Sequence, residues 1–194
     1  MEKNKRNFAN LVLISLYILI ISLSKILPHP ENFTPILGLA IFGGAMYIKR
    51  KVFFIVTIAA LFLSDFIFNN YVHPEYFPDN NGIIFFSNYM IWVYFSIFAI
   101  IFLASKVLKH FNYLKLFFVI LGSSILFYLV TNFGSWLASP ELYTRDFSGI
   151  ISSYIAGIPF FRSTLISNII TGFVIFGIYD LVTTYVYKGK FSLK

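Results

Sequence analysis

Long apolar runs separated by short polar connections dominate the chain, and they predict its architecture. A helix needs about 20 predominantly apolar residues to cross the hydrocarbon core of a bilayer. Six runs satisfy this pattern, although the second is short and rich in small residues. We expect these helices at about residues 8–27, 34–48, 52–68, 84–104, 116–137 and 163–186. The chain is therefore predicted to be an all-α integral membrane protein, with residues 1–194 forming one six-helix transmembrane domain.

Two features at the edges of these runs refine the prediction. The run at 8–27 is too long for the apolar part of a signal peptide and has no small-residue cleavage site, so we interpret it as a retained span. A further apolar stretch at 148–159 is too short to cross the bilayer. We expect it to lie at the membrane interface or to fold back over a cavity.

The cationic side chains alternate with the apolar runs in a way that predicts the topology. Most of the 15 Lys and Arg residues fall in four clusters: Lys3/Lys5/Arg6, Lys49/Arg50/Lys51, Lys106/Lys109/Lys115 and Lys188/Lys190/Lys194. Short loops rich in Lys and Arg stay on the cytoplasmic side of a membrane. Both termini are therefore expected in the cytoplasm, with the acidic connections on the outside.

Composition excludes several classes of protein. Hydrophobic residues make up 58% of the chain and charged residues 12%, which is unlike a soluble domain. The net charge of +7 lies in brief cytoplasmic connections, where topology and lipid headgroups account for it, so no nucleic acid partner is expected. The chain has no cysteine and no catalytic or nucleotide-binding motif. We therefore expect neither an enzyme, nor a metal site, nor a cofactor.

Polar side chains within the spans gather in the predicted outer half of the membrane. Tyr128, Asn132 and Trp136 are spaced by four residues and so share one helix face. Aromatic walls with a few polar groups are typical of a solute-binding pocket. The candidate substrate-binding residues are His29, Asn32, Asp65, Asn88, Trp92, Tyr128, Asn132, Trp136, Arg162 and Asn168.

Structural roles compete with this interpretation. A carboxylate within a span usually faces protein or water and has a partner, so Asp65 and Arg162 are expected to pair, structurally or around a solute. Trp92 and Trp136 also fit an interfacial aromatic belt, and Asn168 fits an interhelical hydrogen bond. The small residues of the second run let neighbouring backbones approach closely, and we assign them to helix packing. They are Gly38, Ala40, Gly43, Gly44 and Ala45.

Several motifs resemble those of a bacterial integral membrane family of unknown function that is assigned to transport. They are Asn32-Phe-Thr-Pro35, Ala40-Ile-Phe-Gly-Gly-Ala45, Ser64-Asp65, Thr131-Asn-Phe-Gly-Ser-Trp136 and Ile158-Pro-Phe-Phe-Arg-Ser-Thr164. That family is in turn similar to the substrate-binding S components of energy-coupling-factor (ECF) vitamin transporters. Those bundles have six helices, cytoplasmic termini and a solute pocket near the outer face.

This resemblance implies a function. It implies uptake of a small solute or vitamin across the bacterial inner (cytoplasmic) membrane, with ECF transmembrane and ATPase subunits as partners. Among these, the chain resembles the cobalamin-specific S components, and by this likeness His29, Asp65 and Arg162 would correspond to polar residues around the pocket. Those relatives present a cysteine to cobalt, whereas this chain has none. The alternative is a scaffold protein of a cell-envelope complex that has no solute site.

Overall fold

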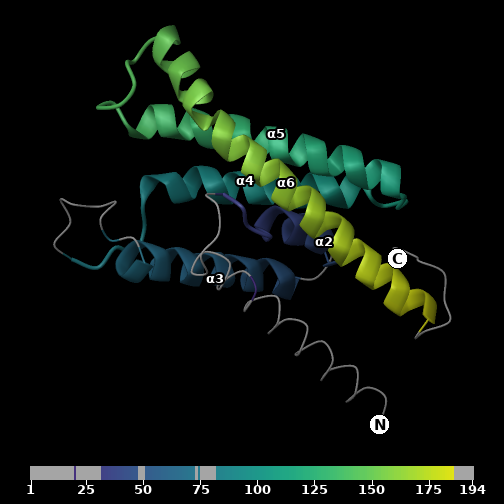
Figure 1. The fold of residues 1–194 in the computed structure, drawn as a ribbon. Coiled ribbons are helices and arrows are strands. Elements are labelled where there is room, and N and C mark those ends of the chain that lie inside the picture. The colour runs from purple at the N-terminus through teal and green to yellow at the C-terminus, as the bar shows by residue number, and fades with distance from the viewer. Residues whose placement is uncertain (1–19, 21–31, 48–50, 73, 75–81, 186–194) are drawn as a thin grey trace. The chain divides into compact units, whose positions relative to one another are not determined.

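The computed structural model describes residues 20, 32–47, 51–72, 74 and 82–185, and the regular structure in this part of the chain is entirely helical (Figure 1). The elements are α2 (Ile36–Tyr47), α3 (Lys51–Ile67), the π-helix η1 (Phe68–Val72), α4 (Asn88–Val107), α5 (Tyr113–Ala138) and α6 (Phe147–Tyr185). The all-α prediction is confirmed for these residues. The predicted span at 8–27 lies outside them, apart from Ile20.

Four of the described segments are long and apolar enough to cross a membrane. They are Phe53–Val72, Asn88–Val107, Tyr113–Ala138 and Phe147–Leu181, and Ile36–Met46 is a shorter apolar helix. Only helices and closed barrels can span a bilayer, because every backbone polar group must find a partner within the protein. These helices make the chain a multi-pass membrane protein.

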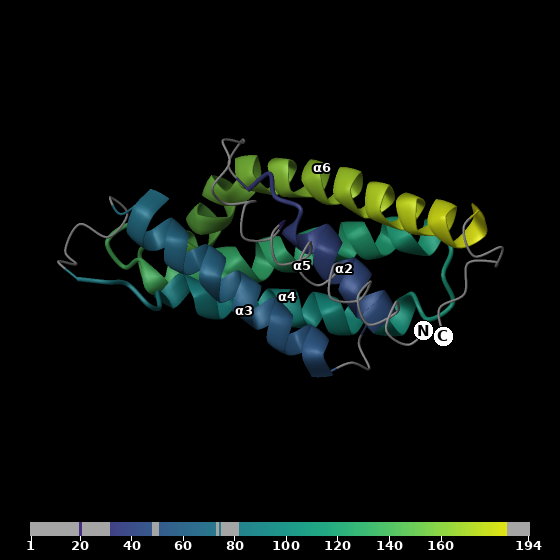
Figure 2. The ribbon, with the colours of Figure 1, turned by 90° about the horizontal axis from the view of Figure 1, so that it is seen from below.

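The last helix differs from the sequence prediction. α6 begins at Phe147, so residues 148–159 are the first part of one continuous helix, and the predicted helix start at 163 is wrong. Pro159 lies inside α6, and Figures 1 and 2 show that the helix changes direction in its first third. A proline lacks the N–H that would bond to the carbonyl four residues earlier, so it bends a helix without necessarily ending it.

The chain forms two compact units, each of which is described by itself. The first contains α3 and η1. Its most informative contact joins η1 to the segment before α4: the Asn70 side-chain amide accepts from the Ile84 N–H and donates to the Ile84 carbonyl, both at 2.8 Å. Because the N–H and the carbonyl of Ile84 are both bonded to the Asn70 side chain, they do not form helical hydrogen bonds, and residue 84 is not helical. The helix predicted to start at residue 84 therefore begins at Asn88.

The second unit contains α2, α4, α5 and α6. α2 packs against α4 and α6, and α5 packs against the same two helices (Figure 2). α2 approaches α4 closely at Gly44, where a Cβ atom would overlap the backbone carbonyl of Ile101 in α4. On the other side of α2, a Cβ at Gly38 would lie 2.8 Å from the side chain of Thr171 in α6.

Polar side chains lie inside this second unit and apolar ones cover its outside. Ser124 and Asn168 are fully buried, whereas Phe95, Phe118 and Ile178 are among the most exposed large hydrophobic side chains. The Asn168 amide donates to the Ser124 hydroxyl at 2.9 Å. An apolar exterior is suited to lipid, and buried polar groups of this kind hydrogen-bond between membrane helices.

An aromatic cluster fixes the end of α6 that is remote from the α5–α6 connection. Phe176 is fully buried, and its ring is stacked on Phe111 with centroids 5.2 Å apart. Phe42 of α2 meets the same ring edge-on at 5.3 Å. The cluster thus joins α2, α6 and the connection between α4 and α5.

Candidate functional site

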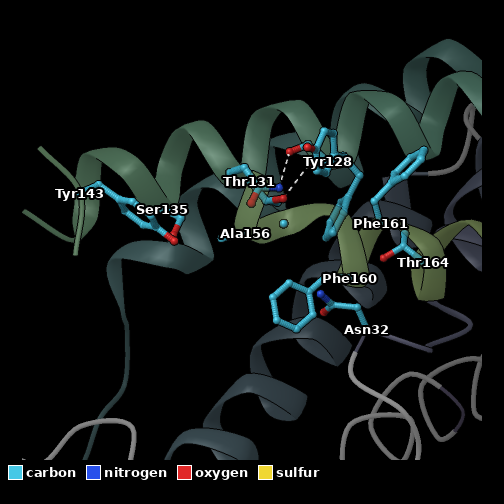
Figure 3. A pocket seen from close by; sticks show the side chains of 12 residues that line it. Asn32, Tyr128, Thr131, Ser135, Tyr143, Ala156, Phe160, Phe161 and Thr164 are labelled. Atoms are coloured by element: carbon cyan, nitrogen blue, oxygen red, sulfur yellow. Dashed lines mark hydrogen bonds between the residues drawn. The ribbon is translucent and has the colours of Figure 1, made fainter. Parts of the chain in front are cut away.

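A cavity of about 200 Å³ lies between α5, α6 and the residue segment that leads into α2 (Figure 3). All of its lining belongs to the second unit. The lining residues are Asn32, Phe127, Tyr128, Thr131, Asn132, Ser135, Tyr143, Ala156, Gly157, Phe160, Phe161 and Thr164. Three segments distant in sequence thus meet around one space.

The α5 wall of the cavity carries several polar side chains, and hydrogen bonds hold three of them. The Thr131 hydroxyl donates to the Phe127 carbonyl at 2.7 Å. The Asn132 amide donates to the Tyr128 carbonyl at 2.8 Å. The Tyr128 hydroxyl donates across to the carbonyl of Tyr154 in α6 at 2.6 Å. These bonds fix the positions of the three side chains.

The α6 wall is shaped by Gly157 and by aromatic rings. A Cβ atom at Gly157 would overlap the Asn132 side chain, so the amide rests directly on the α6 backbone. The Ser153 hydroxyl donates to the backbone carbonyl of Asn132 at 2.7 Å, and this bond joins α6 to α5 at the level of the cavity. The ring of Phe161 lies 5.1 Å from that of Tyr128. Only glycine at position 157 permits the close contact between the Asn132 side chain and α6.

Asn32 closes the cavity opposite α5. Figure 3 shows Asn32 and Phe160 together on the side of the cavity that faces away from Thr131. Asn32 has φ +58°, a left-handed conformation that asparagine tolerates better than most residues. Close by, the Ser167 hydroxyl of α6 donates to the Thr34 carbonyl at 2.6 Å. The segment before α2 is thereby fastened to α6.

Beyond the cavity, two side chains of the connection between α5 and α6 cap the adjoining helix ends. The Arg145 guanidinium donates to the carbonyls of Trp136 and Leu137 at 3.0 and 2.6 Å, which satisfies the C-terminal end of α5. Asp146 caps α6. A hydrogen bond from the Gly149 N–H, then one from the Thr144 hydroxyl, lowers the pKa of the Asp146 carboxyl below its ordinary value. The Asp146 cap explains why α6 starts so early.

The structure brings some of the predicted site residues together. Asn32, Tyr128 and Asn132 line the cavity. Trp136 does not, because its indole N–H turns to the Thr144 carbonyl at 2.8 Å. Trp92 lies against Gly134, where a Cβ would overlap its ring.

The other predicted site residues lie elsewhere in the fold. Asn88 and Arg162 are exposed, on α4 and α6 respectively, and Asn168 takes part in the buried bond to Ser124. Asp65 is fully buried in α3, in the other compact unit, and its pairing with Arg162 stays a prediction. His29 lies outside the described residues.

Several cavity residues were not singled out as site residues from the sequence. Thr131 and Ser135 share one face of α5 through their spacing of four, and Gly157 and Phe160 lie next to Pro159. The spacing of Thr131 and Ser135 could have indicated them. Nothing in the sequence could have indicated Gly157, because its importance comes from the contact with Asn132.

Charge is missing from the cavity wall. Each of its 12 lining residues is uncharged. Among the described residues there is also no group of His, Asp and Glu side chains that could hold a metal ion. The chemistry on offer is therefore hydrogen bonding and contact with aromatic rings.

Comparison with known proteins gives one match. Residues 4–189 match the model of a family of unknown function, DUF6580. No curated protein and no solved structure matches the chain. Since the matched residues cover almost its entire length, the chain belongs to the DUF6580 family.

Proposed function

We propose that this protein is a membrane solute-binding protein, similar to an ECF S component, and that the cavity between α5 and α6 is its binding site. The observation that carries the proposal is the cavity wall: three distant segments place fixed amide, hydroxyl and aromatic groups around about 200 Å³. A concave site with apolar walls and a few oriented polar groups is suited to a small molecule. The volume corresponds to about six or seven waters at about 30 Å³ each, so the solute is smaller than a corrinoid.

The proposal includes the membrane topology. Six spans would place both termini in the cytoplasm of a bacterial cell, with the chain in the inner membrane. The solute would enter from outside and pass inward, energised by ECF transmembrane and ATPase subunits or carried passively. The lysine and arginine clusters support this orientation.

Gly157→Ala is expected to lower solute retention at least tenfold while leaving the protein folded. The new methyl group would overlap the Asn132 side chain, which must then move into the cavity. Gly177→Ala in the same helix is the matched control, because a Cβ there meets nothing within 4 Å. Small molecules that co-purify in detergent are quantified by mass spectrometry for the wild type and both variants.

Equal retention by all three proteins would remove the cavity from consideration. If no small molecule co-purifies and none can be added back, a scaffold role without a solute site is the better explanation. Thermal unfolding of the three proteins shows whether a loss of retention is due to a loss of folding.

The orientation can be tested with single cysteines, because the chain has none of its own. Cysteines at Lys51 and Lys109 are expected to be shielded from a membrane-impermeant thiol reagent in intact cells, whereas those at Asp79 and Ser139 are expected to react. Permeabilised cells provide the control for accessibility, since all four should then be labelled. The reverse pattern would contradict an outward-facing cavity.

A further inference from the structure

We infer that the cavity selects a small, uncharged, planar solute that donates hydrogen bonds, such as a primary amide attached to a ring. This inference rests on the proposed function and specifies the class of solute. Two observations carry it. Several hydroxyl and amide hydrogens of the α5 wall are already bonded within the protein, and the lining residues are uncharged.

Most of the fixed hydrogen-bond donors of the α5 wall are already bonded within the protein. The single hydroxyl hydrogens of Thr131 and Tyr128 go to the Phe127 and Tyr154 carbonyls. One amide hydrogen of Asn132 goes to the Tyr128 carbonyl. The hydroxyl oxygens of Thr131 and Tyr128 and the Asn132 side-chain carbonyl can still accept. At Tyr128, Thr131 and Asn132 the acceptors therefore outnumber the donors that remain, so a solute that donates suits this part of the wall best. The Ser135 hydroxyl, one turn further along α5, can donate or accept.

The uncharged lining disfavours ions. None of the 12 residues supplies a counter-charge for a bound carboxylate or ammonium group. A charge moved from water into such a site loses hydration without gaining an ionic partner. A carboxylate would also bring oxygen atoms, which are acceptors, against the acceptor oxygens of Thr131 and Asn132.

The aromatic residues indicate a flat solute. Figure 3 shows the rings of Tyr128 and Phe161 near one another, with Phe160 on the side of Asn32. Tyr128 and Phe161 are inclined by 51° and separated by 5.1 Å, so together they form one aromatic wall. Flat rings pack favourably on such surfaces. The volume of about 200 Å³ admits a single six-membered ring with one substituent.

Three probes of nearly equal size test the inference: benzamide, benzoate and benzylammonium. Benzamide is an uncharged donor, benzoate is an anion without donors, and benzylammonium is a charged donor. Binding to the full-length protein in detergent is measured by equilibrium dialysis. We expect benzamide to bind at least tenfold more tightly than either ion.

Thr131→Val tests the acceptor role, because valine has the same shape without the hydroxyl. We expect benzamide binding to weaken about five- to tenfold. Thr57→Val is the matched control: the Thr57 hydroxyl makes the same type of bond, to the carbonyl of Phe53 at 2.8 Å, but Thr57 lies in α3 and does not line the cavity. Its benzamide binding should equal that of the wild type.

The outcomes separate the inference from the proposed function. Benzoate or benzylammonium binding as tightly as benzamide, with binding abolished by Gly157→Ala, would overturn the solute class and leave the cavity as the binding site. Benzamide binding that Thr131→Val leaves unchanged would overturn the acceptor role in the same way. If no probe binds, the solute class is wrong, and the retention of co-purifying molecules by Gly157→Ala decides the binding site separately. If Gly157→Ala lowers neither probe binding nor retention more than Gly177→Ala does, the proposed binding site is wrong as well.

Discussion

Phe176→Ala is expected to lower the free energy of unfolding by about 3–5 kcal/mol, the usual range for deleting a buried phenylalanine. Phe176 has no exposed surface, and it contacts Phe111 and Phe42 through ring faces and edges. Its loss leaves a void where α2, α6 and the α4–α5 connection meet. Lipid cannot fill such a void, so the dispersion contacts of the lining are forfeited.

The measurement is chemical denaturation of the purified protein in detergent. Phe118→Ala in α5 makes the same chemical change at a side chain that is 59% exposed, where lipid or detergent replaces the lost contacts. A cost below about 1 kcal/mol is expected there. Similar costs for the two variants would mean that the aromatic cluster does not hold the bundle together.

Gly44→Ala is expected to destabilise the protein by about 1–3 kcal/mol, although alanine is the better helix former. The added methyl group would overlap the Ile101 carbonyl, and a backbone atom cannot move aside as a side chain can. α2 and α4 must therefore separate around Gly44. Denaturation in detergent measures the effect.

Gly122→Ala in α5 is the control for Gly44→Ala. A Cβ at Gly122 meets nothing within 4 Å, so this change should be neutral or stabilising. Destabilisation by both variants would point to a general intolerance of alanine in these helices. A neutral Gly44→Ala would show that the α2–α4 interface adjusts easily.

The apolar runs predicted most of the described helices, because a bilayer imposes a minimum length and demands that backbone groups be satisfied within each span. Helical spacing also placed Tyr128 and Asn132 on a common face, and both line the cavity. These predictions depend on local periodicity. A single sequence contains that information directly.

Two features of the α5–α6 region did not follow from the apolar pattern: the orientation of Trp136 and the start of α6. The spacing of four put Trp136 on the face of Tyr128 and Asn132, but the Thr144 carbonyl in the following connection takes its N–H. The apolar stretch at 148–159 was predicted to be separate from the last span, yet Asp146 caps the helix upstream of it and α6 continues through Pro159. The Trp136 contact forms between residues of two different segments, whereas the Asp146 cap joins residues only three apart and is a local signal that the apolar pattern does not contain.

The length of α6 has a consequence for the membrane itself. Its 39 residues extend about 58 Å at about 1.5 Å each, far beyond a hydrocarbon core of about 30 Å. The cavity residues Gly157 and Phe160 lie close to Pro159, where the helix changes direction. If the part of α6 that follows Pro159 crosses the hydrocarbon core, the cavity lies close to the boundary of that core. Bilayer thickness then determines whether water or acyl chains bathe its mouth. Access to the proposed binding site should accordingly fall as the lipid chains are lengthened.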